Sequence, residues 1–104
     1  MEYVKNIAAI AVGKEGEAES LYGKAAQGDE EAKARLVEIY MHKAVEIAQE
    51  MNVSEASLKD LVNEGIIGSL LGIEKLTGAE DADRIIVAQM KESMCALLEK
   101  KKEN

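Results

Sequence analysis

The side chains that could do metal or redox chemistry in this chain are one histidine, one cysteine and scattered carboxylates. His42, Glu46 and Glu50 follow at intervals of four residues, which would place them on one helical face, where they could hold a metal ion weakly. A stable site needs three or four converging ligands, and Cys95 is distant in the sequence. A surface or half-buried histidine is the favoured interpretation, and we expect neither a metal nor a cofactor.

The remaining motifs do not indicate an enzyme. The turn at 13–16 reads G-K-E-G, but its glycine spacing differs from that of a phosphate-binding loop, and no Lys-Ser or Lys-Thr pair follows. No acid/base pair has a recognisable partner, and no nucleophile stands beside a base. Cys95 falls in the apolar phase of its helical segment, which predicts a small buried core residue. We therefore expect a binding or structural protein.

The composition is that of an acidic, helix-forming protein. Thirteen Lys and Arg face 20 Asp and Glu, which gives a formal net charge of −7 and a pI of about 4.8. This charge argues against general affinity for nucleic-acid backbones or anionic membranes. The apolar run 7–12 is too short to span a bilayer and lacks the basic flank of a secretion signal, while a single cysteine excludes an internal disulfide. We expect a cytoplasmic protein without membrane contact.

The hydrophobic periodicity predicts an all-α fold, a single-domain bundle of about five helices. Glycines and turn residues separate the helical patterns, and Asp29 is the expected N-cap of the longest one. The predicted helices 30–51 and 58–76 are consecutive and joined by a short turn, so they should pack as an antiparallel pair. The predicted helices cover 2–12, 17–26, 30–51, 58–76 and 82–99.

The 58–76 segment is expected to be either the centre of the bundle or an edge offered to a partner. Glycines recur on one side of it, although each glycine in a helix interior costs about 1 kcal/mol relative to alanine. The usual compensation is a neighbouring backbone that packs unusually close. The glycines are Gly65, Gly68 and Gly72, and the aliphatic residues at helical spacing are Leu58, Leu61, Val62, Ile66, Leu70 and Ile73.

Two motifs resemble one known family. Residues 27–32 read Q-G-D-E-E-A, and residues 60–68 read D-L-V-N-E-G-I-I-G. Together they resemble region two of bacterial RNA polymerase sigma factors of the sigma-70 family, whose signature reads D-L-I/V-Q-E-G. The resemblance covers about 17–76 and implies a sigma-like helical domain over 17–99, with a helix and turn at 1–16 and a frayed tail at 100–104.

The resemblance also implies a partner. In that family the signature helix grips the coiled coil of the polymerase largest subunit, and the positions that would face it here are Asp60, Asn63, Glu64, Ile66 and Leu70. Two acids and an amide beside exposed aliphatic residues can bind a basic, partly apolar coiled coil. The face is more apolar than the family pattern, because Ile66 replaces a frequent Asn and Leu71 replaces a frequent Lys. A homodimer through this face is therefore the alternative.

DNA melting is not implied. Where the family has a W-W-I-R-Q stretch that captures unstacked bases, this chain has I-I-V-A-Q at 85–89. Stacking on an aromatic ring contributes about 1 to 3 kcal/mol per base, and isoleucine cannot supply it. Arg84, Lys91 and the lysines of the tail remain as weak DNA-contact candidates. We expect a transcription initiation or regulatory module that binds polymerase and does not melt promoter DNA alone.

Overall fold

The computed structural model describes the backbone of residues 2–103 and the side chains of 5–54 and 57–100. It confirms the all-α prediction, because every regular element in this part of the chain is a helix. The connections between helices are short, and α3 to α5 are the long elements. The five helices are α1 (Glu2–Ala8), α2 (Glu17–Ala26), α3 (Glu30–Glu50), α4 (Glu55–Glu74) and α5 (Ala82–Glu103).

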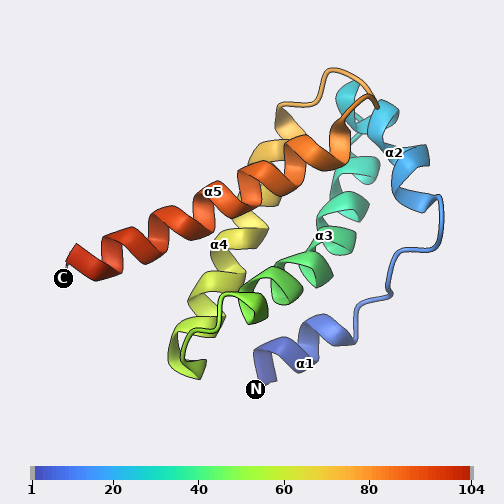
Figure 1. Ribbon diagram of the computed structural model, residues 1–104. Coiled ribbons are helices and arrows are strands. Elements are labelled where there is room, and N and C mark those ends of the chain that lie inside the picture. Colours follow the sequence, from blue (N-terminus) through green and yellow to red (C-terminus); the bar gives the residue numbers. More distant parts are fainter. Residues whose placement is uncertain (1, 104) are drawn as a thin grey trace.

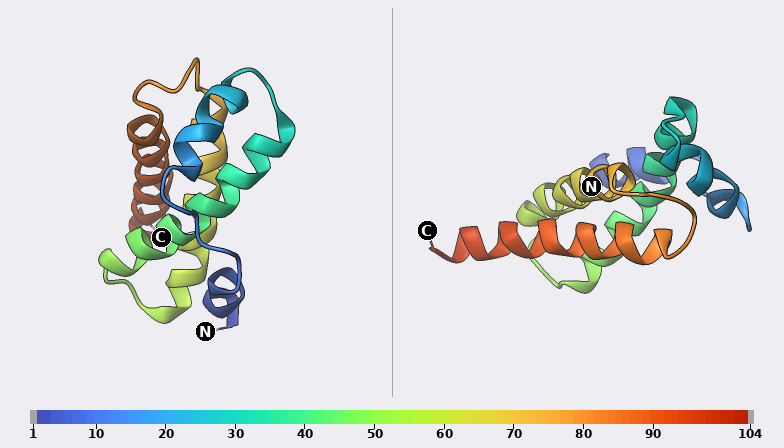
Figure 2. Two further views of the ribbon diagram at one scale, coloured as in Figure 1. Left: turned by 90° about the vertical axis from the view of Figure 1, so that its right-hand side faces the viewer. Right: turned by 90° about the horizontal axis from the view of Figure 1, so that it is seen from above.

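Helix α4 lies between α3 and α5 and makes its most extensive contacts with α5. Figure 1 shows that α4 runs back antiparallel to α3, and that α5 then returns along α4. Helix α2 packs near the first half of α3, and α1 lies beside the second half of α3. The right-hand view of Figure 2 shows α5 continuing past the rest of the bundle toward the C-terminus. The predicted antiparallel pair is therefore present, with α5 as the third layer.

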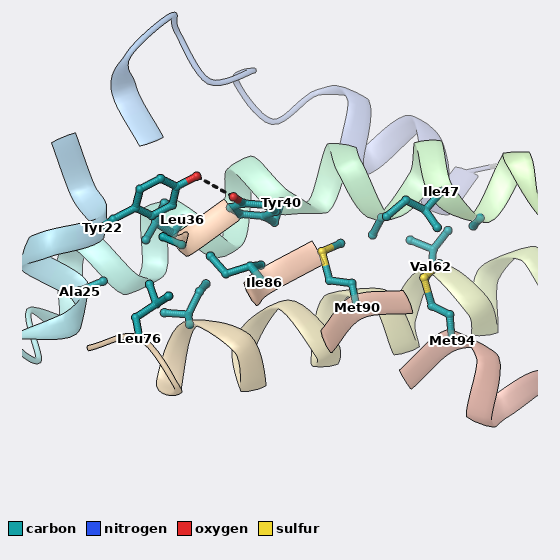
Figure 3. Close-up of a cluster of buried hydrophobic side chains, with 14 of the residues drawn as sticks. Tyr22, Ala25, Leu36, Tyr40, Ile47, Val62, Leu76, Ile86, Met90 and Met94 are labelled. Atoms are coloured by element: carbon teal, nitrogen blue, oxygen red, sulfur yellow. Dashed lines mark hydrogen bonds between the residues drawn. The ribbon is translucent and has the colours of Figure 1, made fainter. Parts of the chain in front are cut away.

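The core is a continuous cluster contributed by α2 to α5 together with Ile7 of α1. Figure 3 shows these side chains pointing into the space between the helices. Burying a valine, leucine, isoleucine or methionine side chain contributes about 1.5 to 3 kcal/mol to the stability of the fold. The fully buried large residues include Leu36 of α3, Leu61, Val62 and Ile73 of α4, and Ile86, Met90 and Met94 of α5.

The glycines of α4 make its close approach to α5 possible. A Cβ added at Gly68 would lie 2.7 Å from the Met90 Cα, and one at Gly72 would lie 2.8 Å from the Ile86 Cα. Both contacts are with backbone, which cannot move aside as a flexible side chain can. The expected close packing of a neighbouring backbone is thus confirmed, and its partner is α5.

Several local predictions need correction. Helix α5 continues to Glu103, beyond its predicted end at 99 and into the tail that was expected to fray. The first helix ends at Ala8, not near residue 12, because the following carbonyls bond to α3: Ile10 O lies 2.9 Å from His42 Nε2, and Ala11 O accepts from Arg35 Nη1 at 3.2 Å. Cys95 is exposed and is not a core residue. One residue advances about 100° around a helix, so Cys95 turns away from the stripe that buries Met94.

The helix starts follow capping chemistry only in part. Asp29 is the N-cap of α3, and its Oδ1 accepts a hydrogen bond from the Ala32 N–H at 3.0 Å, as predicted. Helix α4 begins at Glu55 and ends at Glu74, both earlier than predicted, and Ser54 occupies its N-cap without a side-chain hydrogen bond. The earlier start leaves the phase of the helix unchanged, so the faces predicted for it can be compared directly.

Candidate functional site

One side of α4 is covered by neither α3 nor α5. Ile67, Leu70 and Leu71 are 44%, 46% and 46% exposed there, and with Val12 they are the exposed large hydrophobic residues of the described chain. Contiguous exposed apolar residues on an otherwise buried helix are typical of an interaction site. We call this surface the α4 face, and its members, all exposed, are Asp60, Asn63, Ile67, Leu70, Leu71 and Glu74.

The position of the α4 face follows from helical phase. Residues 60, 63, 67, 70 and 74 are spaced by three and four, so they form one stripe along the helix. The glycine side is occupied by α5, whereas Val62 and Ile73 are buried in the cluster that includes α3. Because these two contacts fix the rotation of α4 about its axis, the stripe is held toward solvent.

The structure brings three of the five predicted partner-binding residues onto the α4 face. Asp60, Asn63 and Leu70 lie there. Glu64 is half-buried at the edge toward α5, where it lines a shallow hollow together with Ser93, Ala96, Leu97 and Lys100. Ile66 is half-buried on the opposite edge and packs against the core. These five residues therefore do not share one surface.

Besides Glu74, Ile67 is the member of the α4 face that the sequence analysis missed. It is exposed at the centre of the stripe, one turn after Asn63 and one turn before Leu70. The spacing from Asn63 was a usable signal. It was obscured because Ile66 and Ile67 are adjacent and identical, so the pattern alone does not say which of the two is packed against the core.

The ends of the α4 face are acidic. Asp60 stands near one end and Glu74 at the other, where Glu74 Oε1 lies 3.3 Å from Lys33 Nζ of α3. Lys75, just beyond Glu74, donates a hydrogen bond to the Gln89 side chain of α5. An apolar centre between acidic ends complements a partner helix that carries aliphatic residues flanked by basic ones.

The weak DNA-contact candidates lie on another surface. Arg84 and Lys91 are both exposed on α5, two turns apart. Arg84 Nη2 pairs with Asp81 Oδ2 at 3.2 Å. The 85–89 stretch, where the resemblance would require base-capturing residues, is used for packing: Ile86 is fully buried, and Ile85 and Val87 lie against the core.

A hydrogen-bonded chain of side chains joins α2, α3 and α5. The Tyr22 and Tyr40 hydroxyls are 2.7 Å apart, and the Tyr40 hydroxyl donates to Asp83 Oδ1 at 2.6 Å. Figure 3 shows the two tyrosines meeting across the gap between their helices. Burial, followed by the bond to Asp83, raises the pKa of Tyr40, and burial also raises the pKa of Tyr22. No sequence motif pointed to this chain, since its members are 18 and 43 residues apart.

Arg35 fastens the 9–16 linker and α2 to α3. Its Nε lies 2.6 Å from Glu17 Oε2 and its Nη2 lies 3.1 Å from Glu17 Oε1, a two-pronged ion pair, while Glu38 accepts from Nη1 at 3.2 Å. The Arg35 hydrogen bond, and then the bond from the Lys14 N–H, lower the pKa of Glu17 to about 2. This ion pair therefore holds the start of α2 against α3.

The weak metal site that His42, Glu46 and Glu50 could have formed is not assembled. His42 Nε2 is 2.9 Å from Ile10 O, and Glu46 Oε1 is 3.6 Å from Lys43 Nζ. Among the residues that the structure describes, no three His, Cys, Asp or Glu side chains come together as metal ligands would. Within that same part of the chain, no helix has both the length and the apolar character to cross a membrane.

Comparisons with known proteins give no family assignment. Neither the protein-family models, nor the curated proteins, nor the solved structures contain a match to this chain.

Proposed function

We propose that this chain is a sigma-factor-like transcription module that docks onto the coiled coil of the largest subunit of RNA polymerase through the α4 face. The observation that carries the proposal is the exposure of Ile67, Leu70 and Leu71 on a helix that is buried on its other sides. Asp60 and Asn63, which the sigma-70 resemblance assigns to the same contact, extend that stripe.

The energetics of such a contact suit the α4 face. Burying three half-exposed aliphatic side chains in the complex would stabilise it by about 25 cal/mol for each Å² of apolar surface removed from water. Asp60 lies at the rim, where charge mainly accelerates and orients the encounter with a basic partner. The apolar centre would therefore set the lifetime of the complex, and the acids would set its rate of formation.

Promoter melting lies outside the proposed function. Ile85, Ile86 and Val87 are committed to the core, so the helix that would meet DNA presents no stacking surface there. Arg84 and Lys91 offer two cations among many acids. Any contact with DNA would have to form within a larger complex in which another polypeptide supplies the reading of bases.

The test is a fluorescence anisotropy titration of the labelled polymerase coiled coil with this protein. We expect affinity on the order of micromolar, and we expect Asp60→Lys to weaken it by about tenfold, mainly by slowing association. Glu15→Lys reverses an exposed acid in the linker between α1 and α2 and is the matched control. Absence of binding, or equal binding by the Asp60 and Glu15 variants, would reject the proposal.

Self-association is the second candidate, and the same exposed leucines favour it. Charge disfavours it, since an antiparallel pairing of two α4 faces centred on Ile67 sets Asp60 of one copy opposite Glu74 of the other. These residues lie two turns before and two turns after Ile67. Sedimentation equilibrium distinguishes the two: a dimer broken by Leu71→Lys but not by Val12→Lys supports self-association, and a monomer at all concentrations removes it.

A further inference from the structure

A second concave surface lies between α2 and α3, beside the first turn of α5. It is a hollow of about 480 Å³, which we call the tyrosine hollow, and Tyr22, Tyr40 and Asp83 are among its lining residues. Both tyrosines are otherwise buried, at 6% and 4% exposure. The tyrosine hollow therefore adjoins a tightly packed part of the interior.

The directions of the hydrogen bonds in the tyrosine hollow are fixed by proton count. A phenolic hydroxyl has a single hydrogen, and Tyr40 gives its hydrogen to the Asp83 carboxylate. The Tyr40 oxygen must then accept from Tyr22, so the hydrogen of Tyr22 is also committed. Because both hydrogens are used, the Tyr22 oxygen and the carboxylate can only accept further bonds. The interior of the hollow is an array of acceptors.

The rim of the tyrosine hollow adds further negative charge and an apolar wall. Glu19 and Glu46 line the hollow, together with the aliphatic side chains of Ala18 and Ile39. The one basic residue of the lining is Lys43, whose Nζ lies 3.6 Å from Glu46 Oε1. A complementary ligand must carry hydrogen-bond donors and positive charge at one end, and a short apolar stem behind them.

We propose that the tyrosine hollow binds a primary ammonium or guanidinium group on a short alkyl chain, carried by a small amine or by a lysine or arginine side chain of a protein. The cationic head binds between the Asp83 carboxylate and the Tyr22 oxygen. The alkyl stem lies along Ala18 and Ile39. Lys43, which carries an ammonium group of its own, competes at the rim. This proposal is independent of the docking proposed for α4.

The test is a titration with putrescine and agmatine, and in parallel with a short peptide whose only charged side chain is one arginine. Tyrosine fluorescence is a direct readout, because the chain has three tyrosines and no tryptophan, and two of the three line the hollow. We expect a saturable, one-site change that weakens as salt is added. Tighter binding of the free amines assigns a small-molecule source, and tighter binding of the peptide assigns a protein source.

Variants make the test specific. Asp83→Asn keeps an oxygen that accepts from Tyr40 but removes the charge, and it should weaken binding by about tenfold. Glu19→Gln, an exposed change at the rim, should weaken binding less, and Lys43→Met should strengthen it. Asp60→Asn on the α4 face is the control and should have no effect. The proposal would be overturned if no saturable change occurred up to ~10 mM ligand, or if the Asp83 and Glu19 variants bound the ligand as tightly as the wild type.

Discussion

The two sides of α4 show how one helix can be both a packing element and an exposed surface. On the glycine side, Gly68 leaves no room for even a Cβ against the α5 backbone. On the α4 face, Leu70 and Leu71 remain about half exposed. Rotating α4 to bury these leucines would separate Gly68 from Met90 and open the close contact between α4 and α5. The exposure of the leucines is therefore imposed by the packing on the opposite side.

The largest difference between the two sides should appear in stability. Leu61→Ala removes a fully buried side chain and should destabilise the fold by about 2 to 5 kcal/mol, because it leaves a cavity. Leu70→Ala on the α4 face should change stability by less than about 0.5 kcal/mol, since the site is already partly in water. Urea unfolding measures both. Equal losses would mean that Leu70 belongs to the core, and the comparison would fail.

A smaller but more specific effect is expected at the glycines. Gly68→Ala places a Cβ 2.7 Å from the Met90 Cα and should cost about 1 to 3 kcal/mol. Gly23→Ala is the matched control, because a Cβ there meets nothing within 4 Å, and it should stabilise α2 by about 0.5 to 1 kcal/mol. Thermal unfolding separates the two signs. If Gly68→Ala were stabilising instead, there would be room for a methyl group between α4 and α5, and the close packing of the two helices would be wrong.

The hydrogen-bonded tyrosines predict a further loss. Tyr40→Phe removes the hydroxyl that links Tyr22 to Asp83 and leaves the Tyr22 hydroxyl without its buried partner. We expect a loss of about 1 to 3 kcal/mol in urea unfolding. Tyr22→Phe should cost less, because the bond from Tyr40 to Asp83 survives. The reverse order would indicate that Tyr22, and not Tyr40, holds the network together.

The smallest effect is a pH dependence at the ion pair of Glu17 and Arg35. The pKa of Glu17 is about 2 in the folded chain and 4.5 as the ordinary value, so the folded state binds its proton less readily. Its stabilising contribution is present above pH 4.5 and is lost as pH falls toward 2. Glu17→Gln should therefore lower Tm at pH 7 and leave it unchanged near pH 2. Glu15→Gln, an exposed change nearby, should not affect Tm at either pH.

Much of the fold could be predicted because its causes are local. Leu36, Tyr40 and Ala44 recur every four residues along α3 and are buried, and the capping preference of aspartate predicts the start of that helix. The recurrence of Gly65, Gly68 and Gly72 gave the close approach of a neighbouring backbone, although not that α5 supplies it.

The errors arose where distant segments compete for the same groups. The first helix stops early because Arg35 and His42 bind its downstream carbonyls, a contact that no local pattern contains. Cys95 falls in the apolar phase of its segment, which predicts a core residue, but it lies about 100° around α5 from the buried Met94 and is exposed. The α4 face was predicted only in part. Ile66 and Ile67 are adjacent and identical, so the sequence pattern does not show which of them is exposed and which packs against the core.

The most direct test of the docking surface is a chemical-shift map of the isotopically labelled protein as the polymerase coiled coil is added. We predict that the amide signals of Asn63, Ile67, Leu70 and Leu71 shift or broaden together, and that Leu70→Lys abolishes these changes while Val12→Lys preserves them. Shifts confined to α2 and the first half of α3, or no shifts at saturating coiled coil, would contradict the assignment of docking to the α4 face.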